Sequence, residues 1–267
     1  MKKMLCGLAF LILAAQLPLW SYDQSPYYLQ VVPEAIWAAA TGGGTWVTEI
    51  QITMIGSGTA DLYGYFYYNG GQRGPFLLYD GLEQYNSLRY TNFLAKMRAL
   101  DGSFEYYGRV GPLEIFDVYV NPIAVQAKIV NGNYGKTLPA LSYASAANSI
   151  AVTRPMFIQD LAQDLTYRTS VGIFNGSTVT TYTLRFTIVN ANNVKVGADF
   201  EKTIGPYGFM SFNPFAEAGV PSGLYNNCWL AISATAGDSA VPGVFCYASG
   251  ANNYTNDTYA LIARPRN

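Results

Sequence analysis

The absence of one residue type limits the chemistry of this chain. Its 267 residues include no histidine. Ser–His–Asp and Cys–His nucleophiles and histidine-ligated metal sites all need an imidazole, so these classes are excluded. A phosphate-binding loop and a dinucleotide fingerprint are also missing, and Gly42-Gly43-Gly44 is not followed by a helical pattern. We therefore expect a protein that is not an enzyme and has no cofactor and no metal site.

Carboxylates are the remaining groups for acid–base chemistry. Glycosidases use two of them, about 5–10 Å apart. No spacing pairs any two here, so we interpret them as solvated charges on loops and strand edges. Asp117 is expected to cap a turn through its side chain, as is Asp238. Residues 252–257 collect oxygen ligands suited to calcium, but we interpret them as a polar turn. The candidate carboxylates are Glu49, Asp80, Glu83, Glu105, Glu114 and Asp117.

Aromatic residues make up 15% of the chain, and 22 of them are tyrosines. Tyrosine and tryptophan stack on sugar rings and anchor protein interfaces. The adjacent residues Tyr67 and Tyr68 must point to opposite faces of a strand, so one ring lies outside the core. Such rings either pack on a neighbouring domain or form a contact surface for a ligand or partner. The candidate contact residues are Trp46, Tyr65, Tyr67, Tyr68, Tyr106 and Tyr107.

Strand patterns dominate the elements that would position these residues. Tyr63, Tyr65 and Tyr67 alternate along one run and mark a buried face. The run ends in a turn at residues 69–71, and its counterpart ends at 190–193, where Asn and Gly tolerate positive φ. Two short helices are predicted, over residues 92–100 and 213–219. Further strands are expected over residues 48–54, 104–110, 118–130, 170–174, 229–234 and 244–248.

The two halves of the chain align with each other at an offset of 121 residues, from position 31 to 141. Asn69 falls on Asn190, and the turns and strands stay in phase. This pattern predicts an all-β protein with two tandem antiparallel β-sandwich domains related by internal duplication. We place the domains at residues 22–148 and 149–267, with the boundary in the small residues of 143–149.

Three segments of the second half resemble a known kind of domain. They are Thr166-Tyr167-Arg168-Thr169-Ser170-Val171-Gly172-Ile173-Phe174-Asn175, Gly205-Pro206-Tyr207-Gly208-Phe209 and Phe215-Ala216-Glu217-Ala218-Gly219-Val220. They resemble uncharacterised immunoglobulin-like sandwich domains of secreted and surface-attached bacterial proteins. The resemblance implies an extracellular, often repeated module with no assigned catalytic residues.

The first 21 residues have the pattern of a secretory signal peptide. Lys2 and Lys3 precede an apolar run at residues 5–17, which Pro18 ends. That run is too short for a membrane-spanning helix, which takes about 20 residues, although an uncleaved anchor is the alternative. Without the leader the chain has 14 basic and 17 acidic residues. With no basic stripe, we expect no nucleic-acid binding, and we expect no transmembrane segment after signal removal.

Only Cys228 and Cys246 remain after the leader is removed. Both lie nine residues from Gly237, so a hairpin that turns there would place them opposite each other on adjacent strands. A disulfide is then expected, which would agree with export. The alternative is two buried free thiols.

These observations predict an exported structural or interaction protein of the cell surface or extracellular space. It would bind a protein partner or self-associate through tyrosine-rich sandwich faces and exposed strand edges. A pair of carbohydrate-binding modules that recognise a polysaccharide is the main alternative. An exported hydrolase that works through carboxylates is the third.

Overall fold

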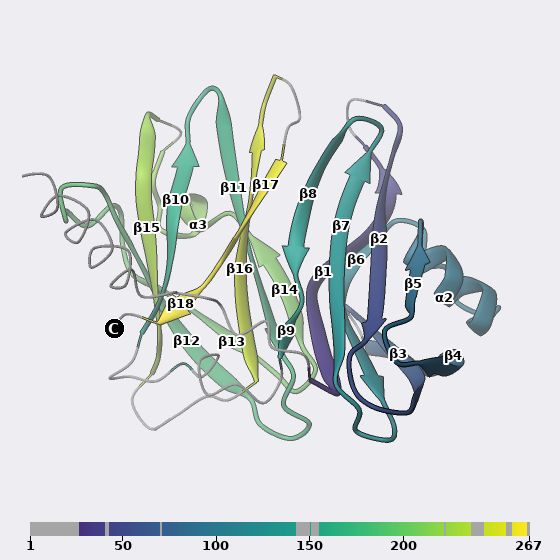
Figure 1. Cartoon of the computed structure of the whole chain (residues 1–267). Helices are drawn as coiled ribbons and strands as arrows, with labels where there is room; N and C mark the ends of the chain where they lie inside the picture. The colour runs from purple at the N-terminus through teal and green to yellow at the C-terminus, as the bar shows by residue number, and fades with distance from the viewer. Residues whose placement is uncertain are drawn as a thin grey trace, which may run out of the picture.

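The computed structural model describes residues 27–40, 43–69, 71–142, 150, 155–221, 223–235, 243–254 and 258–265. Within these ranges the chain is all-β, with eighteen antiparallel strands and two short helices (Figure 1). This confirms the predicted fold class at the level of all-β. The predicted signal peptide at 1–21, the predicted domain boundary at 143–149 and Asp238 lie outside the described residues.

The first half of the chain forms one nine-stranded sheet. Its order is β4-β3-β6-β1-β2-β7-β8, with β5 on β2 and β9 on β1. β1 pairs along its length with β6 and only by its last residues with β2, so it links two layers of strands. The strands are β1 (Leu29–Ala39), β2 (Thr45–Met54), β3 (Thr59–Tyr68), β4 (Gly71–Glu83), β5 (Ser87–Tyr90), β6 (Arg109–Asp117), β7 (Ile123–Asn131), β8 (Tyr134–Pro139) and β9 (Leu141–Ser142).

The second half forms two separate sheets. One has the order β13-β12-β15-β10-β18 and the other β14-β11-β16-β17. No described strand of one half pairs with a strand of the other. The strands are β10 (Met156–Gln163), β11 (Tyr167–Asn175), β12 (Tyr182–Val189), β13 (Phe200–Ile204), β14 (Phe209–Phe212), β15 (Tyr225–Ala234), β16 (Val244–Asn252), β17 (Thr258–Ile262) and β18 (Arg264–Pro265).

The two halves follow the same strand order. The path β4-β3-β6-β1-β9 corresponds to β13-β12-β15-β10-β18, and β5-β2-β7-β8 corresponds to β14-β11-β16-β17. β7 and β16 are offset by 121 residues at both ends. β6 and β15 depart from this offset. The halves differ in that β1 joins the two layers of the first, whereas the corresponding layers of the second are separate sheets.

Both short helices occur where the sequence predicts them, after β5 and after β14. α2 (Phe93–Asp101) begins at Asn92, whose side-chain oxygen accepts a hydrogen bond from the Ala95 amide at 3.1 Å. α3 (Pro214–Glu217) begins in the same way at Asn213. An asparagine oxygen satisfies amides that the first turn of a helix leaves without a partner, so these residues fix where the helices start.

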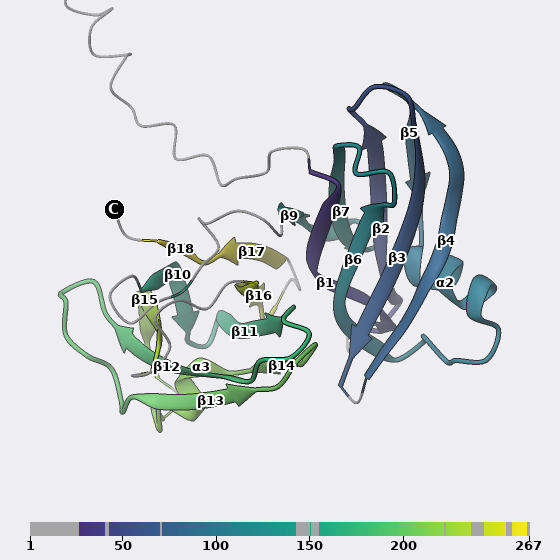
Figure 2. The same ribbon diagram turned by 90° about the horizontal axis from the view of Figure 1, so that it is seen from below.

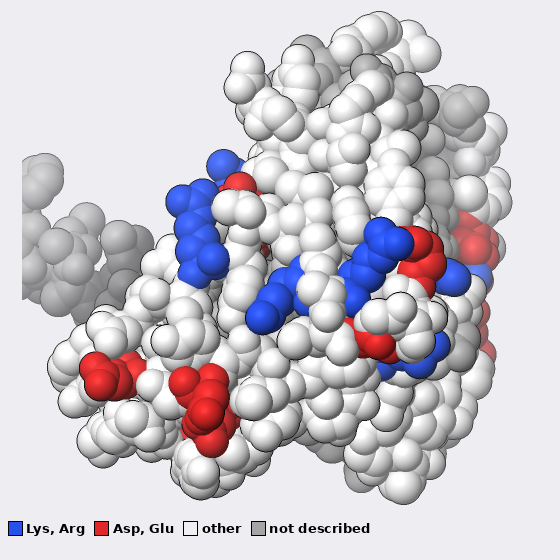
Figure 3. Space-filling view, turned by 90° about the vertical axis from the view of Figure 1, so that its right-hand side faces the viewer, with Lys and Arg blue, Asp and Glu red and all other residues white. Residues whose placement is uncertain are grey.

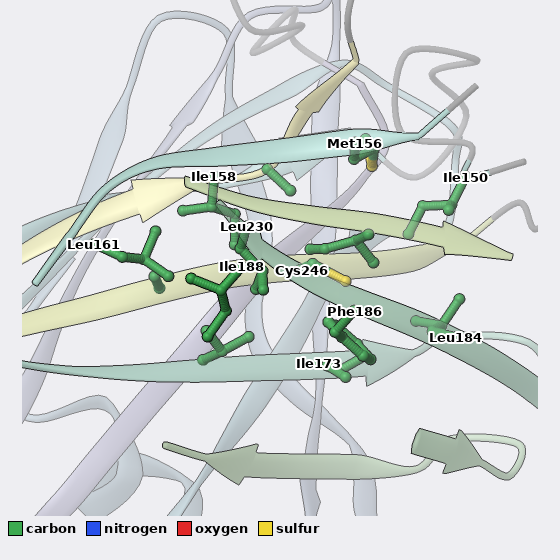
Figure 4. Close-up of a cluster of buried hydrophobic side chains, with 14 of the residues drawn as sticks. Ile150, Met156, Ile158, Leu161, Ile173, Leu184, Phe186, Ile188, Leu230 and Cys246 are labelled. Carbon is green, nitrogen blue, oxygen red and sulfur yellow. The ribbon is translucent and has the colours of Figure 1, made fainter. Parts of the chain in front are cut away.

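Each half has its own apolar core. Leu62, Phe66 and Leu113 are fully buried in the first, and Ile173, Phe186 and Leu230 in the second (Figure 4). The side of the first half that carries α2 is sparsely charged. On it, basic and acidic side chains lie intermixed, and most of the surface is uncharged (Figure 3).

The structure corrects three details of the predicted strands. The strand expected over residues 118–130 begins only at Ile123, after a turn at residues 117–122 that Asp117 caps. β3 sends Leu62 and Phe66 into the core of the first half, so Tyr63, Tyr65 and Tyr67 lie on the outer face of the sheet. The prediction that these tyrosines form the core face of the strand was wrong. The strand expected over residues 104–110 begins only at Arg109, so Tyr106 lies in the preceding loop.

Candidate functional site

The outer face of β3, β6 and β1 is lined by aromatic and aliphatic side chains. Because side chains alternate along a strand, the outward residues of neighbouring strands form rows. Tyr63 lies opposite Phe116 and Tyr65 lies opposite Glu114, while Val31 of β1 adjoins Glu114 from the other side. The Phe116 ring stacks on both Tyr63 and Tyr65 at 5.9 Å between ring centroids. The result is a continuous aromatic row along β3.

The second half of the chain covers one end of this row. Tyr67 is 1% exposed, and its ring lies 4.9 Å from Phe174 and 5.3 Å from Tyr207, which stacks on it nearly in parallel. These residues belong to an apolar cluster shared by both halves, together with Phe245 and Tyr247. The halves meet along this joint (Figure 2). Tyr67 therefore packs against the other half of the chain, which corresponds to one of the two roles expected for such rings.

A buried carboxyl lies within the joint. Glu114 is 6% exposed, and the Tyr67 hydroxyl donates a hydrogen bond to its Oε2 at 2.6 Å. Burial raises the pKa of Glu114 to about 7, and the Tyr67 hydrogen bond opposes this shift only in part. Burial and the neighbouring Glu114 also raise the pKa of Tyr67. The expectation that Glu114 is a solvated charge was therefore wrong.

A second polar contact joins the halves at β8. The Lys136 Nζ donates to Glu34 Oε2 at 2.8 Å and also to the Ser249 hydroxyl of the second half. The Lys136 and Glu34 side chains are 5% and 12% exposed. A buried ion pair with a further hydrogen bond fixes geometry more than it adds net stability. The joint therefore has both an apolar and an ionic component.

The other end of the aromatic row remains open to solvent. We call its residues the tyrosine face: Tyr63, Tyr65, Leu77, Phe116 and Tyr119. Leu77 lies opposite Tyr63 on the edge strand β4 and is 42% exposed, and Tyr119 is 64% exposed.

Two carboxylates border the tyrosine face. The charge of Asp61, and then a hydrogen bond to it, raise the pKa of Tyr119. A hydrogen bond to the same carboxylate raises the pKa of Asp80. These two carboxylates lie side by side at the rim of an open surface. Asp117, another of the six candidate carboxylates, is buried and caps a turn as predicted, because its Oδ2 accepts a hydrogen bond from the Asn121 amide at 2.7 Å.

The remaining predicted contact residues lie elsewhere. Tyr68 points inward from β3 and packs on Phe104, and Tyr106 is fully buried in the same cluster. Tyr107 is 44% exposed and meets Trp37 edge-on. Trp46, on β2, is partly buried against the first core. The structure thus places Tyr65 and Tyr67 on one surface but does not bring Trp46, Tyr68, Tyr106 and Tyr107 to it.

A cleft of about 360 Å³ opens between the β3–β4 hairpin of the first half and the turn before β14. Side chains that line it are Tyr68, Asn69, Gln72, Pro206, Tyr207 and Phe209. No charged side chain is among the described lining residues.

Asn175 holds the turn that forms one wall of this cleft. This fully buried side chain donates from Nδ2 to the carbonyls of Thr180, Ile204 and Gly205 at 2.8–3.2 Å. The Asn175 amide also donates to the Gly208 carbonyl. These bonds fix Tyr207 in a left-handed conformation, with φ of 52°, that residues other than glycine rarely adopt. Sequence reasoning missed this role, although Asn-Gly-Ser is a turn signal.

The two cysteines are free, buried thiols. Cys228 lies on β15 and Cys246 on β16, and these strands belong to different sheets. The prediction that a hairpin would pair them on adjacent strands was wrong. β16, the next strand along the chain, pairs with β11 and β17 in the other sheet and not with β15. Figure 4 shows Cys246 within the second core, beside Phe186. Burial raises the pKa of both thiols.

No helix in the described ranges is long and apolar enough to cross a membrane. The described acidic and cysteine side chains form no group of three that could hold a metal ion.

Comparisons with known proteins identify no relative. No family model and no curated protein matches the chain. Among solved structures, the infectious bursal disease virus Gt strain matches with 9% identity over 92% of this chain and 73% of that chain, at a TM-score of 0.19. The VP2 subviral particle of the same virus matches with 11% identity, the same coverage and a TM-score of 0.19. Scores this low support no argument about fold or function.

Proposed function

We propose that this chain is an exported, non-catalytic structural protein that self-associates through the tyrosine face. In this proposal residues 1–21 are a cleaved signal peptide. The rest forms two immunoglobulin-like sandwich domains that arose by internal duplication. The equal strand order of the halves, the exact offset of β7 and β16, and the matching helix caps Asn92 and Asn213 support the duplication.

One observation carries the proposed association. The outer face of β3 already binds a β-sandwich, since the second half of the same chain covers its Tyr67 end. The remainder of the row has the same composition and stays exposed at Leu77 and Tyr119. A second copy brings aromatic surface of the same kind, and aromatic residues are enriched where interfaces gain their affinity. A small net charge of about −3 after leader removal offers little repulsion between copies.

Sedimentation velocity over a wide range of protein concentration tests the proposal. We expect a concentration-dependent shift from monomer to dimer or larger species. The double variant Leu77→Ser/Tyr119→Ser should weaken association at least tenfold, because it removes two exposed apolar contacts and leaves the cores intact. Tyr254→Ser is the matched control, since Tyr254 is 73% exposed in the second half. A protein that stays monomeric at the highest concentration overturns the proposal and favours a different protein partner.

Carbohydrate binding is a second candidate function. It is favoured by the cleft between the halves, where tyrosine rings and side-chain amides lie together.

A further inference from the structure

The cleft between the halves combines two kinds of lining. Tyr207 and Phe209 supply aromatic lining, and the side chains of Asn69 and Gln72 supply amide donors and acceptors. Tyr68 also lines the cleft, while its ring packs into the first core. Sugars present the complementary pair, because the C–H faces of a pyranose pack on aromatic rings and its hydroxyls bond to amides. The volume of about 360 Å³ falls at the lower end of ligand sites, which span about 300–1,000 Å³.

The absence of charged side chains from the described lining limits which ligands can bind in the cleft. The described lining has no carboxylate, lysine or arginine, so a charged ligand would lose hydration without gaining a counter-ion. The Tyr207 hydroxyl is neutral at physiological pH, and burial raises its pKa further. An uncharged ligand rich in hydroxyl groups matches this lining.

The walls of the cleft are held in place before any ligand arrives. Tyr207 stacks on the buried Tyr67, and Asn175 ties its turn to the end of β11. On the other wall, Tyr68 packs on Phe66 and Phe104. A site built in advance binds more tightly, because little conformational entropy is lost on binding. The left-handed backbone of Tyr207 also places a ring where a glycine would be the unstrained choice.

We propose that this cleft binds the end of an uncharged saccharide. One sugar ring packs against Tyr207, and its hydroxyls bond to the Asn69 and Gln72 amides. This site is separate from the tyrosine face, and the inference rests on carbohydrate binding, the second candidate function, for which it names the ligand class and the contact residues. Both halves of the chain build it, so it exists only in the intact two-domain protein.

Saturation-transfer NMR on the full protein tests this proposal with maltotetraose, cellotetraose, xylotetraose, laminaritetraose and chitotetraose as probes. Tetragalacturonate is the charged comparison. We expect at least one neutral tetrasaccharide to bind and the charged one not to bind. Each hydrogen bond lost should lower the affinity about three- to tenfold. The double variant Asn69→Ala/Gln72→Ala should therefore lower it by about tenfold or more. Gln126→Ala, an exposed amide on β7, is the matched control and should bind as the wild type does.

The proposal is overturned if no neutral tetrasaccharide binds at millimolar concentration, or if the double variant binds as tightly as the wild type. Binding of an uncharged peptide without any saccharide also overturns it. Since both substitutions leave the tyrosine face intact, the double variant should sediment like the wild type. Loss of saccharide binding and loss of self-association are therefore distinguishable.

Discussion

Replacing Glu114 by glutamine tests the joint between the halves. This carboxyl is 6% exposed and accepts a hydrogen bond from Tyr67, and no described lysine or arginine forms a salt bridge with it. Tyr65 lies opposite on β3, and Tyr207 faces it from the second half. The ionised carboxylate is therefore disfavoured in the folded protein. Glutamine has the same shape, carries no charge and can still accept the Tyr67 hydrogen bond.

The direction and size of the effect follow from the pKa. Burial raises the pKa of Glu114 from its ordinary 4.5 to about 7. Between these values the folded state keeps a proton that the unfolded state has released, so stability falls as pH rises. The contribution is full below pH 4.5 and is lost as pH rises through 7. A shift of this size corresponds to about 3 kcal/mol of unfolding free energy.

Urea unfolding of the wild type and Glu114→Gln at pH values from 4.5 to 8 measures this contribution. Other titrating groups affect both proteins alike, so the difference between the two unfolding free energies isolates Glu114. We expect the wild type to lose about 3 kcal/mol relative to the variant across this range. Parallel pH profiles would refute the buried, neutral state of Glu114 and, with it, the close packing of the second half on Tyr67.

Two further predictions concern the second half. Asn175→Ala removes the donor of three hydrogen bonds to carbonyls, two of them at the turn that carries Tyr207. It should lower the unfolding free energy, measured by urea denaturation, by about 3 kcal/mol or more. A loss below about 1 kcal/mol would show that the turn is stable without these hydrogen bonds. Cys228 and Cys246 should react with a thiol reagent only after unfolding, and a reductant should leave the melting temperature unchanged. If the denatured mature protein has no reactive thiol, the two cysteines form a disulfide instead.

Local patterns predicted some of the elements of this fold. Period-two alternation located β3, and the Asn-rich turns marked its end and that of β12. Asn92 and Asn213 predicted helix starts because an asparagine cap acts within its own turn. The turn-capping role of Asp117 was predictable for the same reason. Features that depend on a few neighbouring residues are thus readable from the sequence.

The misassigned features depend on contacts distant in the sequence. Alternation shows that Tyr63, Tyr65 and Tyr67 share a face, but not that this face is the outer one. The burial of Glu114 depends on Tyr207, which is 93 residues away. Likewise, the position of Cys228 follows from the sheet that β15 joins, which the turn between the cysteines does not specify. The tyrosine face is assembled from β3, β4 and β6, so among its residues only Tyr65 was predicted as a contact residue.

Hydroxyl-radical footprinting at low and high protein concentration tests the role of the tyrosine face most directly. If copies associate through it, Tyr63, Phe116 and Tyr119 should lose reactivity as concentration rises. Tyr85 and Tyr254, each 73% exposed elsewhere, should keep theirs. Protection confined to other surfaces, or unchanged reactivity of the tyrosine face in an associated protein, would contradict the proposal.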